Sequence, residues 1–221
     1  MTQTDRIPLF PLGVVLLPGM MLPLHIFENR YKQMMSECVA TGNPFGIVFF
    51  DGQSIRSVGC MARITDVIKQ YDDGRMDIMT RGGDRFVIRE LLEEKAYMEA
   101  EVFYFDDEEE LADDDAQVII KNALNLINEV STGHFGRGIA TIDPKELAYT
   151  IAAFEGFEPA ERQGFLEMTS SSERLKKCVQ ALSRIVTRKR LTREIKQLIG
   201  GNGHPPKSIL TQLKEQLKMN R

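Results

Sequence analysis

The sequence is poor in the residues from which metal sites and disulfide frameworks are built. Its 221 residues include only three cysteines and three histidines. No cysteines form a C-x-x-C pair, and an odd number leaves one thiol unpaired in any disulfide scheme, so a reducing cytosol is the simplest setting. The histidines are far apart, with no cysteine or second histidine at ligand spacing, which argues against a tetrahedral zinc site. We therefore expect no metal and no cofactor. The three cysteines are Cys38, Cys60 and Cys178, and the three histidines are His25, His134 and His204.

Familiar catalytic motifs are also missing. The sequence has no G-x-S-x-G elbow and no H-E-x-x-H zinc motif. Residues 203–208 end in Lys-Ser, but two prolines remove backbone donors that a phosphate-binding loop needs. We expect no catalytic residues and no enzymatic activity. An active site around His134 or His25 that matches no familiar motif is the enzymatic alternative.

The charge argues against a nucleic-acid-binding protein, because 28 Lys and Arg face 32 Asp and Glu, for a net charge of −4. The distribution is uneven. Residues 173–221 hold 13 basic and 3 acidic residues, a balance of +10, without interleaved aromatic residues. This segment either faces solvent, pairs with acidic surface of the same molecule or contacts nucleic acid. Residues 106–115 hold eight acids, typical of a solvated linker and a first helical turn, with a recruiting acidic surface as the alternative.

One uncharged stretch, residues 7–27, is long enough to suggest a membrane span. It contains four prolines, Pro8, Pro11, Pro18 and Pro23, which would break a helix repeatedly. We instead predict strands at residues 7–10 and 14–17 with a turn at residues 18–19. We therefore expect no membrane partner and a cytoplasmic location.

The first half of the chain reads as β-rich. Short apolar runs alternate with Gly and Asp-Gly turn signals, a pattern typical of a small barrel or sandwich. One helix interrupts them, with apolar residues at helical spacing from Phe27 to Cys38 and a stop at Gly42. The predicted strands cover residues 45–50, 60–65, 75–80, 85–92 and 96–105.

In the second half of the chain, the apolar residues recur at helical spacing. Helices are predicted at residues 119–130, from Pro144, from Pro159, and from Ser170 to about Gly200, with capping signals at the last three starts. The fold class is therefore α+β. We expect a β-rich domain at residues 5–106, an all-α bundle at 107–200, and a Gly/Pro linker with a short amphipathic tail at 201–221. The tail is too short to be stable without a partner surface.

Several segments along the chain form a recognisable ordered set. They are Ile7-Pro8-Leu9-Phe10-Pro11-Leu12, Val15, Leu17-Pro18-Gly19, Leu22-Pro23-Leu24-His25-Ile26-Phe27-Glu28 with Arg30 and Tyr31, Phe45-Gly46-Ile47-Val48, residues 58–64, Asp73-Gly74, Gly83-Asp84-Arg85-Phe86-Val87-Ile88, residues 100–102, residues 163–167 and Arg174-Leu175. Together these segments resemble a known family, the substrate-binding (amino-terminal) domain of the ATP-dependent Lon protease. The resemblance covers about residues 5–190.

The resemblance implies a PUA-like β pseudo-barrel followed by a helical bundle. It also implies capture of unfolded or peptide segments of other proteins, with a separate protease or chaperone as a further partner. The family's ATPase and Ser-Lys peptidase modules are not in this sequence, so we expect a stand-alone, peptidase S16-like Lon-domain protein. The sequence does not define an oligomeric state. PUA-like domains also bind RNA and small molecules, which is the alternative function.

The residues of these segments have two interpretations. The first is structural: the prolines stiffen an apolar segment, Gly59 and Gly83 mark bulges or close approaches, and Arg85 and Phe86 lock a strand against the helix. Glu28, beside Arg30, would accept helix amides or pair with Arg85. The second is a soft, methionine-containing binding patch that adapts to varied partners. That patch would consist of Met20, Met21, Leu22, Leu24, His25, Phe27 and Tyr31.

The leading hypothesis is a non-catalytic protein- or peptide-binding module. Binding would take place in an apolar groove of the β-rich domain or between the two domains.

Overall fold

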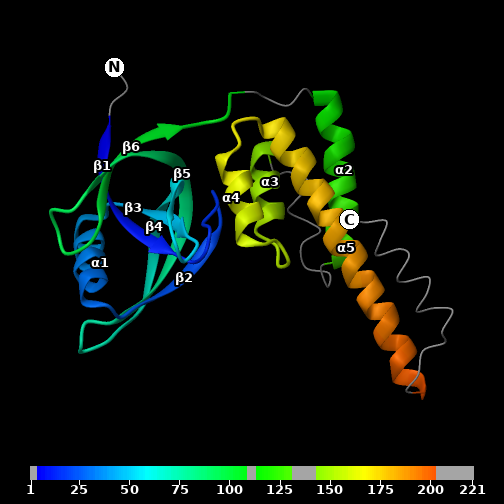
Figure 1. The fold of residues 1–221 in the computed structure, drawn as a ribbon, viewed down its shortest axis with the longest axis horizontal. Helices are drawn as coiled ribbons and strands as arrows, with labels where there is room; N and C mark the ends of the chain where they lie inside the picture. Colours follow the sequence, from blue (N-terminus) through cyan, green and yellow to red (C-terminus); the bar gives the residue numbers. More distant parts are fainter. Residues whose placement is uncertain (1–3, 109–112, 131–142, 203–221) are drawn as a thin grey trace.

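Strands dominate the first half of the chain and helices the second in the computed structural model, which describes residues 4–108, 113–130 and 143–202 (Figure 1). The predicted α+β class is confirmed. We call the six strands and helix α1 the β body. Its elements are β1 (Asp5–Leu12), β2 (Met21–Ile26), α1 (Asn29–Thr41), β3 (Phe45–Phe50), β4 (Ile55–Gln70), β5 (Met76–Leu92) and β6 (Glu99–Phe105). The helices that follow are α2 (Asp113–Val130), α3 (Pro144–Ala152), α4 (Pro159–Glu167) and α5 (Ser171–Asn202).

The sheet closes on itself, as a barrel does. Its strand order is β2-β5-β4-β3-β1-β6, and β5 also pairs with β6. Strands β1 and β3 are parallel, and the other pairs are antiparallel. The long strand β5 makes closure possible, because its first half pairs with β2 and its second half with β6. The two strands predicted at residues 75–80 and 85–92 are one strand, which continues through Gly82 and Gly83.

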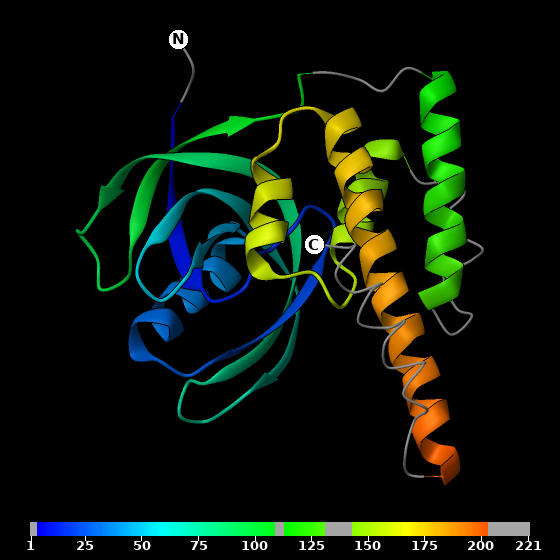
Figure 2. The same ribbon diagram turned by 45° about the vertical axis from the view of Figure 1, so that its right-hand side comes forward.

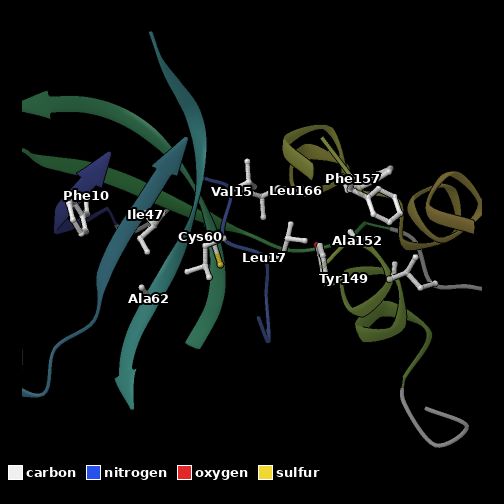
Figure 3. Packing of buried hydrophobic residues seen from close by; sticks show 14 of the residues in the cluster. Phe10, Val15, Leu17, Ile47, Cys60, Ala62, Tyr149, Ala152, Phe157 and Leu166 are labelled. Carbon is white, nitrogen blue, oxygen red and sulfur yellow. The ribbon is translucent and has the colours of Figure 1, made fainter. Parts of the chain in front are cut away.

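The apolar core runs from the β body into the helices. One cluster fills the ring interior and includes Leu9, Val48 and Phe86. A larger cluster joins residues of the β body to residues of α3, α4 and α5, and Figure 3 shows Leu17 between the strands and Tyr149. The two halves of the chain are therefore packed against each other through a shared hydrophobic core.

The prediction of a strand at residues 14–17 is wrong. This segment is irregular, although Val15, Leu16 and Leu17 are buried. Its backbone lies against β5 at Gly82, where a Cβ atom would come within 2.1 Å of the Leu17 carbonyl oxygen. Burial in an irregular segment produces the same apolar run as a strand, so the sequence pattern could not separate them.

The predicted helices are present, although α2 begins at Asp113 and not at residue 119. Gly42 ends α1 at φ 71° and its N–H donates to the Cys38 carbonyl. The Asp143 side chain caps α3, and Glu158 and Glu161 form the capping box of α4. Helix α5 extends past the β body (Figure 2) and ends at Asn202, so most of the predicted linker and the tail lie outside the described residues. None of the described helices has the length and hydropathy of a membrane span.

Candidate functional site

Two adjoining hollows lie between the β body and helix α3, and we refer to them together as the groove. The larger has a volume of about 580 Å³ and the smaller of about 340 Å³. Pro18 and Tyr149 line both hollows, so the two adjoin along one side of α3. The larger hollow is also lined by Gly19, Met20, Arg81, Glu146, Thr150, Ala153, Phe154 and Glu155, and the smaller by Gly83, Asp84, Arg85, Tyr104, Phe105, Asp106 and Lys145.

The groove wall on the side of the β body is a tight turn that is hydrogen-bonded to β5. Gly19 has φ 77°, a conformation that favours glycine, and its N–H donates to the Gly82 carbonyl at 3.0 Å. The Gly82 N–H in turn donates to the Met20 carbonyl at 2.9 Å. These two bonds fix Pro18 and Met20 at the edge of the groove. The half-buried Met20 thus presents a flexible apolar side chain on a rigid backbone.

The opposite wall is one face of α3 and the turn after it. Helix α3 buries Leu147 and Ile151 in the shared core. Glu146, Thr150 and Ala153 follow at i, i+4 and i+7, which places them on a common face toward the groove. The amphipathic pattern of α3 thus determines which residues line this wall.

A buried ion cluster fixes the helices against the β body beside the groove. Asp107 accepts hydrogen bonds from Arg85 at 2.5 Å and from Arg174 at 2.8 and 2.5 Å. The two guanidinium groups also donate to backbone carbonyls, Arg85 to Leu166 and Met168, and Arg174 to Met168. The side chains of Arg85, Asp107 and Arg174 are 2%, 6% and 0% exposed. We call these three residues the Asp107 cluster.

The cluster keeps Asp107 ionised. Burial alone would raise the pKa of the Asp107 carboxyl, but the hydrogen bonds and charge of Arg174, together with the charge of Arg85, outweigh burial and lower the pKa below its ordinary value. One carboxylate faces two guanidinium groups, and the Tyr149 ring lies 4.3 Å from the Arg174 guanidinium carbon, a cation–π distance. The backbone carbonyls, the aromatic face and the exposed Asp106, whose Oδ1 lies 3.8 Å from Arg85, offset the excess positive charge of the cluster.

Tyr149 is the residue that joins the cluster to the groove. Burial raises the pKa of its hydroxyl to about 12, so the hydroxyl stays protonated. Among the residues that the structure describes, this buried oxygen has no hydrogen-bond partner. Tyr149 therefore contributes a ring to the groove wall and no proton-transfer chemistry.

The seven residues proposed as a soft patch do not share one surface. Met20 lines the groove. Along β2 the alternation of a strand turns Leu22 and Leu24 toward the core and leaves Met21 48% exposed. Of the others, Phe27 is 60% exposed on the surface, whereas Tyr31 is buried with its ring 4.2 Å from the Phe10 ring.

His25 belongs to a small surface cluster apart from the groove. Its Nδ1 lies 2.5 Å from Asp77, which also accepts a hydrogen bond from the Tyr71 hydroxyl at 2.9 Å. Both partners lower the pKa of Asp77. The Phe27 ring stacks on His25 with a centroid distance of 5.9 Å. His134, the other histidine considered for an active site, lies outside the described residues.

No metal or thiol chemistry is evident in the described part of the chain. Within it, no three His, Cys, Asp or Glu side chains are grouped as metal ligands. Cys38, Cys60 and Cys178 are all buried. Burial raises their pKa values to about 11, 12 and 12, so these thiols are poor nucleophiles.

The structural expectations for Glu28, Arg85 and Phe86 need correction. Glu28 pairs with Arg30 at 2.9 Å and not with Arg85. Phe86 packs inside the ring, where its side chain would collide with a Cβ at Gly59, and not against α1. The reason is that β5 places alternate residues on opposite faces, so Arg85 points to the helices and Phe86 into the ring.

The glycines and prolines of the motif segments have distinct positions. Gly59 makes the expected close approach, with a would-be Cβ 2.4 Å from the Phe86 ring. At Gly83 the same atom would meet only ordinary contacts, and the crowded position is Gly82. Pro8 and Pro11 lie in β1, Pro23 in β2 and Pro18 in the groove turn.

Sequence reasoning missed the α3 wall and the Asp107 cluster. Asp107 lies in the acidic run that we interpreted as a linker, and only its pairing partners distinguish it from its neighbours. Arg85 and Arg174 do occur in the segments that carry the family resemblance, and that was the available signal.

The comparisons with known proteins agree on one family. The model of the ATP-dependent protease La (LON) substrate-binding domain matches residues 6–184. The Lon protease of Desulfosudis oleivorans is 24% identical over 196 residues, and that of Roseiflexus castenholzii is 26% identical over 198 residues. Each match covers 81% of this chain and 24% of the relative, so the chain spans about a quarter of the length of these proteins.

Two solved structures share the fold. The N-terminal domain of a Mycobacterium avium complex Lon protease has a TM-score of 0.68 at 20% identity, covering 81% of this chain and 98% of that one. The Lon N-terminal domain protein from Xanthomonas campestris has a TM-score of 0.64 at 23% identity, covering 80% and 98%.

Proposed function

Since the chain belongs to the ATP-dependent protease La (LON) substrate-binding domain family, we propose that it recognises substrates by holding an unfolded polypeptide segment in the groove. The segment would lie between the turn at Pro18 and the exposed face of α3. The chain would bind this segment without cleaving it. The observation that carries the proposal is the groove itself, two adjoining hollows between walls that are fixed in place.

The dimensions and lining of the groove suit an extended chain. Two adjoining hollows of about 580 and 340 Å³ offer room for successive side chains. Met20, Ala153 and Phe154 supply apolar surface, and Met20 can adjust to side chains of different shape. Such a surface favours apolar polypeptide segments without strict sequence specificity.

The charge of the groove disfavours RNA, the alternative ligand. Four carboxylates and three cations line the two hollows, a balance of −1. One of the cations, Arg85, is already paired with Asp107, and another, Lys145, is paired with Asp106. An RNA-binding surface needs unpaired cations that follow the phosphate backbone.

A binding assay with a groove-filling variant tests the proposal. Fluorescence anisotropy would follow a labelled, permanently unfolded protein as the chain is added. Thr150→Trp places a large ring in the groove and is expected to weaken binding at least tenfold. Ser183→Trp, also on a helix but exposed on α5, is the matched control and should bind as the unsubstituted chain does.

Three results would contradict the proposal. They are equal binding by both variants, no binding by the unsubstituted chain, and cleavage of the polypeptide on a gel. A parallel titration with single-stranded RNA separates the alternative function, which predicts tight, salt-sensitive RNA binding.

A further inference from the structure

Two carboxylates, one on α3 and one in the turn after it, lie at the edge of the larger hollow. Glu146 lies in the first turn of the helix and Glu155 lies in the turn that follows it. Both are exposed, and neither forms an ion pair with a residue that the structure describes. Arg81, on the opposite wall, is likewise exposed and outside the ion pairs of the described chain. The edge of the larger hollow therefore presents a net charge of −1.

We propose that the groove selects polypeptide segments in which two basic residues flank a short apolar stretch. This inference rests on the proposed function and names its substrate class. The apolar residues would contact Met20, Ala153 and Phe154 between the two carboxylates. Lysine or arginine side chains would reach Glu146 and Glu155, since their long apolar stems can cross the groove wall while their charged ends stay in solvent.

The separation of the two carboxylates sets the spacing of the basic residues. Helical backbone from Glu146 to Ala153 rises about 10 Å, at about 1.5 Å per residue, and the two further residues to Glu155 lie in the turn and add at most about 7 Å. An extended peptide advances about 3.3 Å per residue, so three to five residues, about four, cover that distance. The preferred segment therefore has basic residues at positions i and i+4, with apolar residues between them.

The expected contribution of each carboxylate is modest because both are exposed. An exposed ion pair corresponds to an affinity change of roughly threefold, so the two together give roughly tenfold at low salt. Screening should reduce this preference at high salt, whereas apolar binding should persist. The salt dependence thus separates the selecting charges from the apolar contacts.

Labelled peptides that share one apolar core test the inference. Three of them carry Lys, Gln or Glu at both i and i+4, and a fourth carries Lys at i and i+2. At low salt the unsubstituted chain should bind the Lys i, i+4 peptide roughly tenfold more tightly than the Gln peptide and should bind the Glu peptide most weakly. The double variant Glu146→Gln/Glu155→Gln should bind the Lys and Gln peptides alike.

Glu90→Gln is the matched control, because Glu90 is exposed on β5 and does not line the groove. This variant should keep the full preference for the Lys i, i+4 peptide. Equal binding of the Lys, Gln and Glu peptides by the unsubstituted chain would overturn the charge selection alone. Retention of the preference by the double variant would also overturn it. Equal binding of the two Lys spacings would refute the geometry, and failure of every peptide to bind would refute the proposed function as well.

Discussion

Removal of the Asp107 carboxylate should destabilise the whole molecule, because this one anion compensates two buried cations. In Asp107→Ala, the guanidinium groups of Arg85 and Arg174 lose three hydrogen bonds and their only buried counter-ion in the Asp107 cluster. Breaking a buried ion pair from one side costs about 3–5 kcal/mol. Three charge-assisted hydrogen bonds at about 1.5 kcal/mol each give a similar figure.

Urea unfolding followed by circular dichroism measures this loss. With a slope of about 2.5 kcal/mol/M, the midpoint should fall by roughly 1–2 M. Asp84→Ala is the control, because Asp84 is exposed and also lines the groove; it should change the free energy of unfolding by less than about 0.5 kcal/mol.

A further variant keeps the reasoning testable if Asp107→Ala does not fold. Replacing the whole cluster by apolar side chains, as Arg85→Met/Asp107→Leu/Arg174→Met, removes all three charges together. It should be more stable than Asp107→Ala, since no unpaired charge is left buried. If Asp107→Ala lowered the free energy of unfolding by less than about 1 kcal/mol, the three charges could not form a buried, mutually dependent cluster, and the account would be refuted.

Three other changes follow from the described contacts. Tyr149→Phe should leave the free energy of unfolding unchanged or raise it by about 1 kcal/mol, because it removes a buried hydroxyl without a partner among the described residues; a loss above about 1 kcal/mol would contradict this. Gly82→Ala should lower the free energy of unfolding by about 1–3 kcal/mol, because the new Cβ atom would clash with the Leu17 carbonyl. Gly164→Ala should raise it by up to about 1 kcal/mol, because α4 has open space at this position. Equal effects of the two substitutions in chemical denaturation would contradict the observed packing. Folding lowers the pKa of Asp107, so the ionised carboxylate should stabilise the fold fully above its ordinary pKa of about 4. This stabilisation should be lost as the pH falls through the pKa of Asp107 in the folded chain. Measurements of the free energy of unfolding against pH should show this loss in the unsubstituted chain and not in Asp107→Ala.

Local features of the fold could be predicted from the sequence because they depend on near neighbours. The spacing from Tyr31 to Cys38 and the stop at Gly42 give α1, and the Asp143-Pro144 pair gives the start of α3. Each of these signals acts within one or two helical turns. The α+β class follows from such signals, but the order of the strands does not, because β2 was not predicted as a strand and β5 was predicted as two.

Tertiary features could not be predicted in the same way. The parallel pairing of β1 with β3 and the double use of β5 depend on residues distant in sequence. The groove brings Pro18 next to Tyr149, and Asp107 meets Arg174 across 67 positions. A single sequence carries no local pattern for such contacts, and the family resemblance was the only indication of them.

The candidate binding surface likewise combines local features that could be predicted with tertiary features that could not. The apolar residues of β2 were identified, but alternation along the strand divides them between the core and solvent. Only Met20, which precedes the strand, lies in the groove. The α3 wall has an ordinary amphipathic pattern, which gives no sign that its exposed face lines a cavity.

The most direct test of the central claim is an NMR titration of the isotopically labelled chain with a permanently unfolded polypeptide. The account predicts that the largest amide shift changes occur at Met20, Thr150 and Ala153, on the two walls of the groove. Changes that instead concentrate at Met21 and Phe27 would place binding on the exposed surface around β2, and this result would contradict the account.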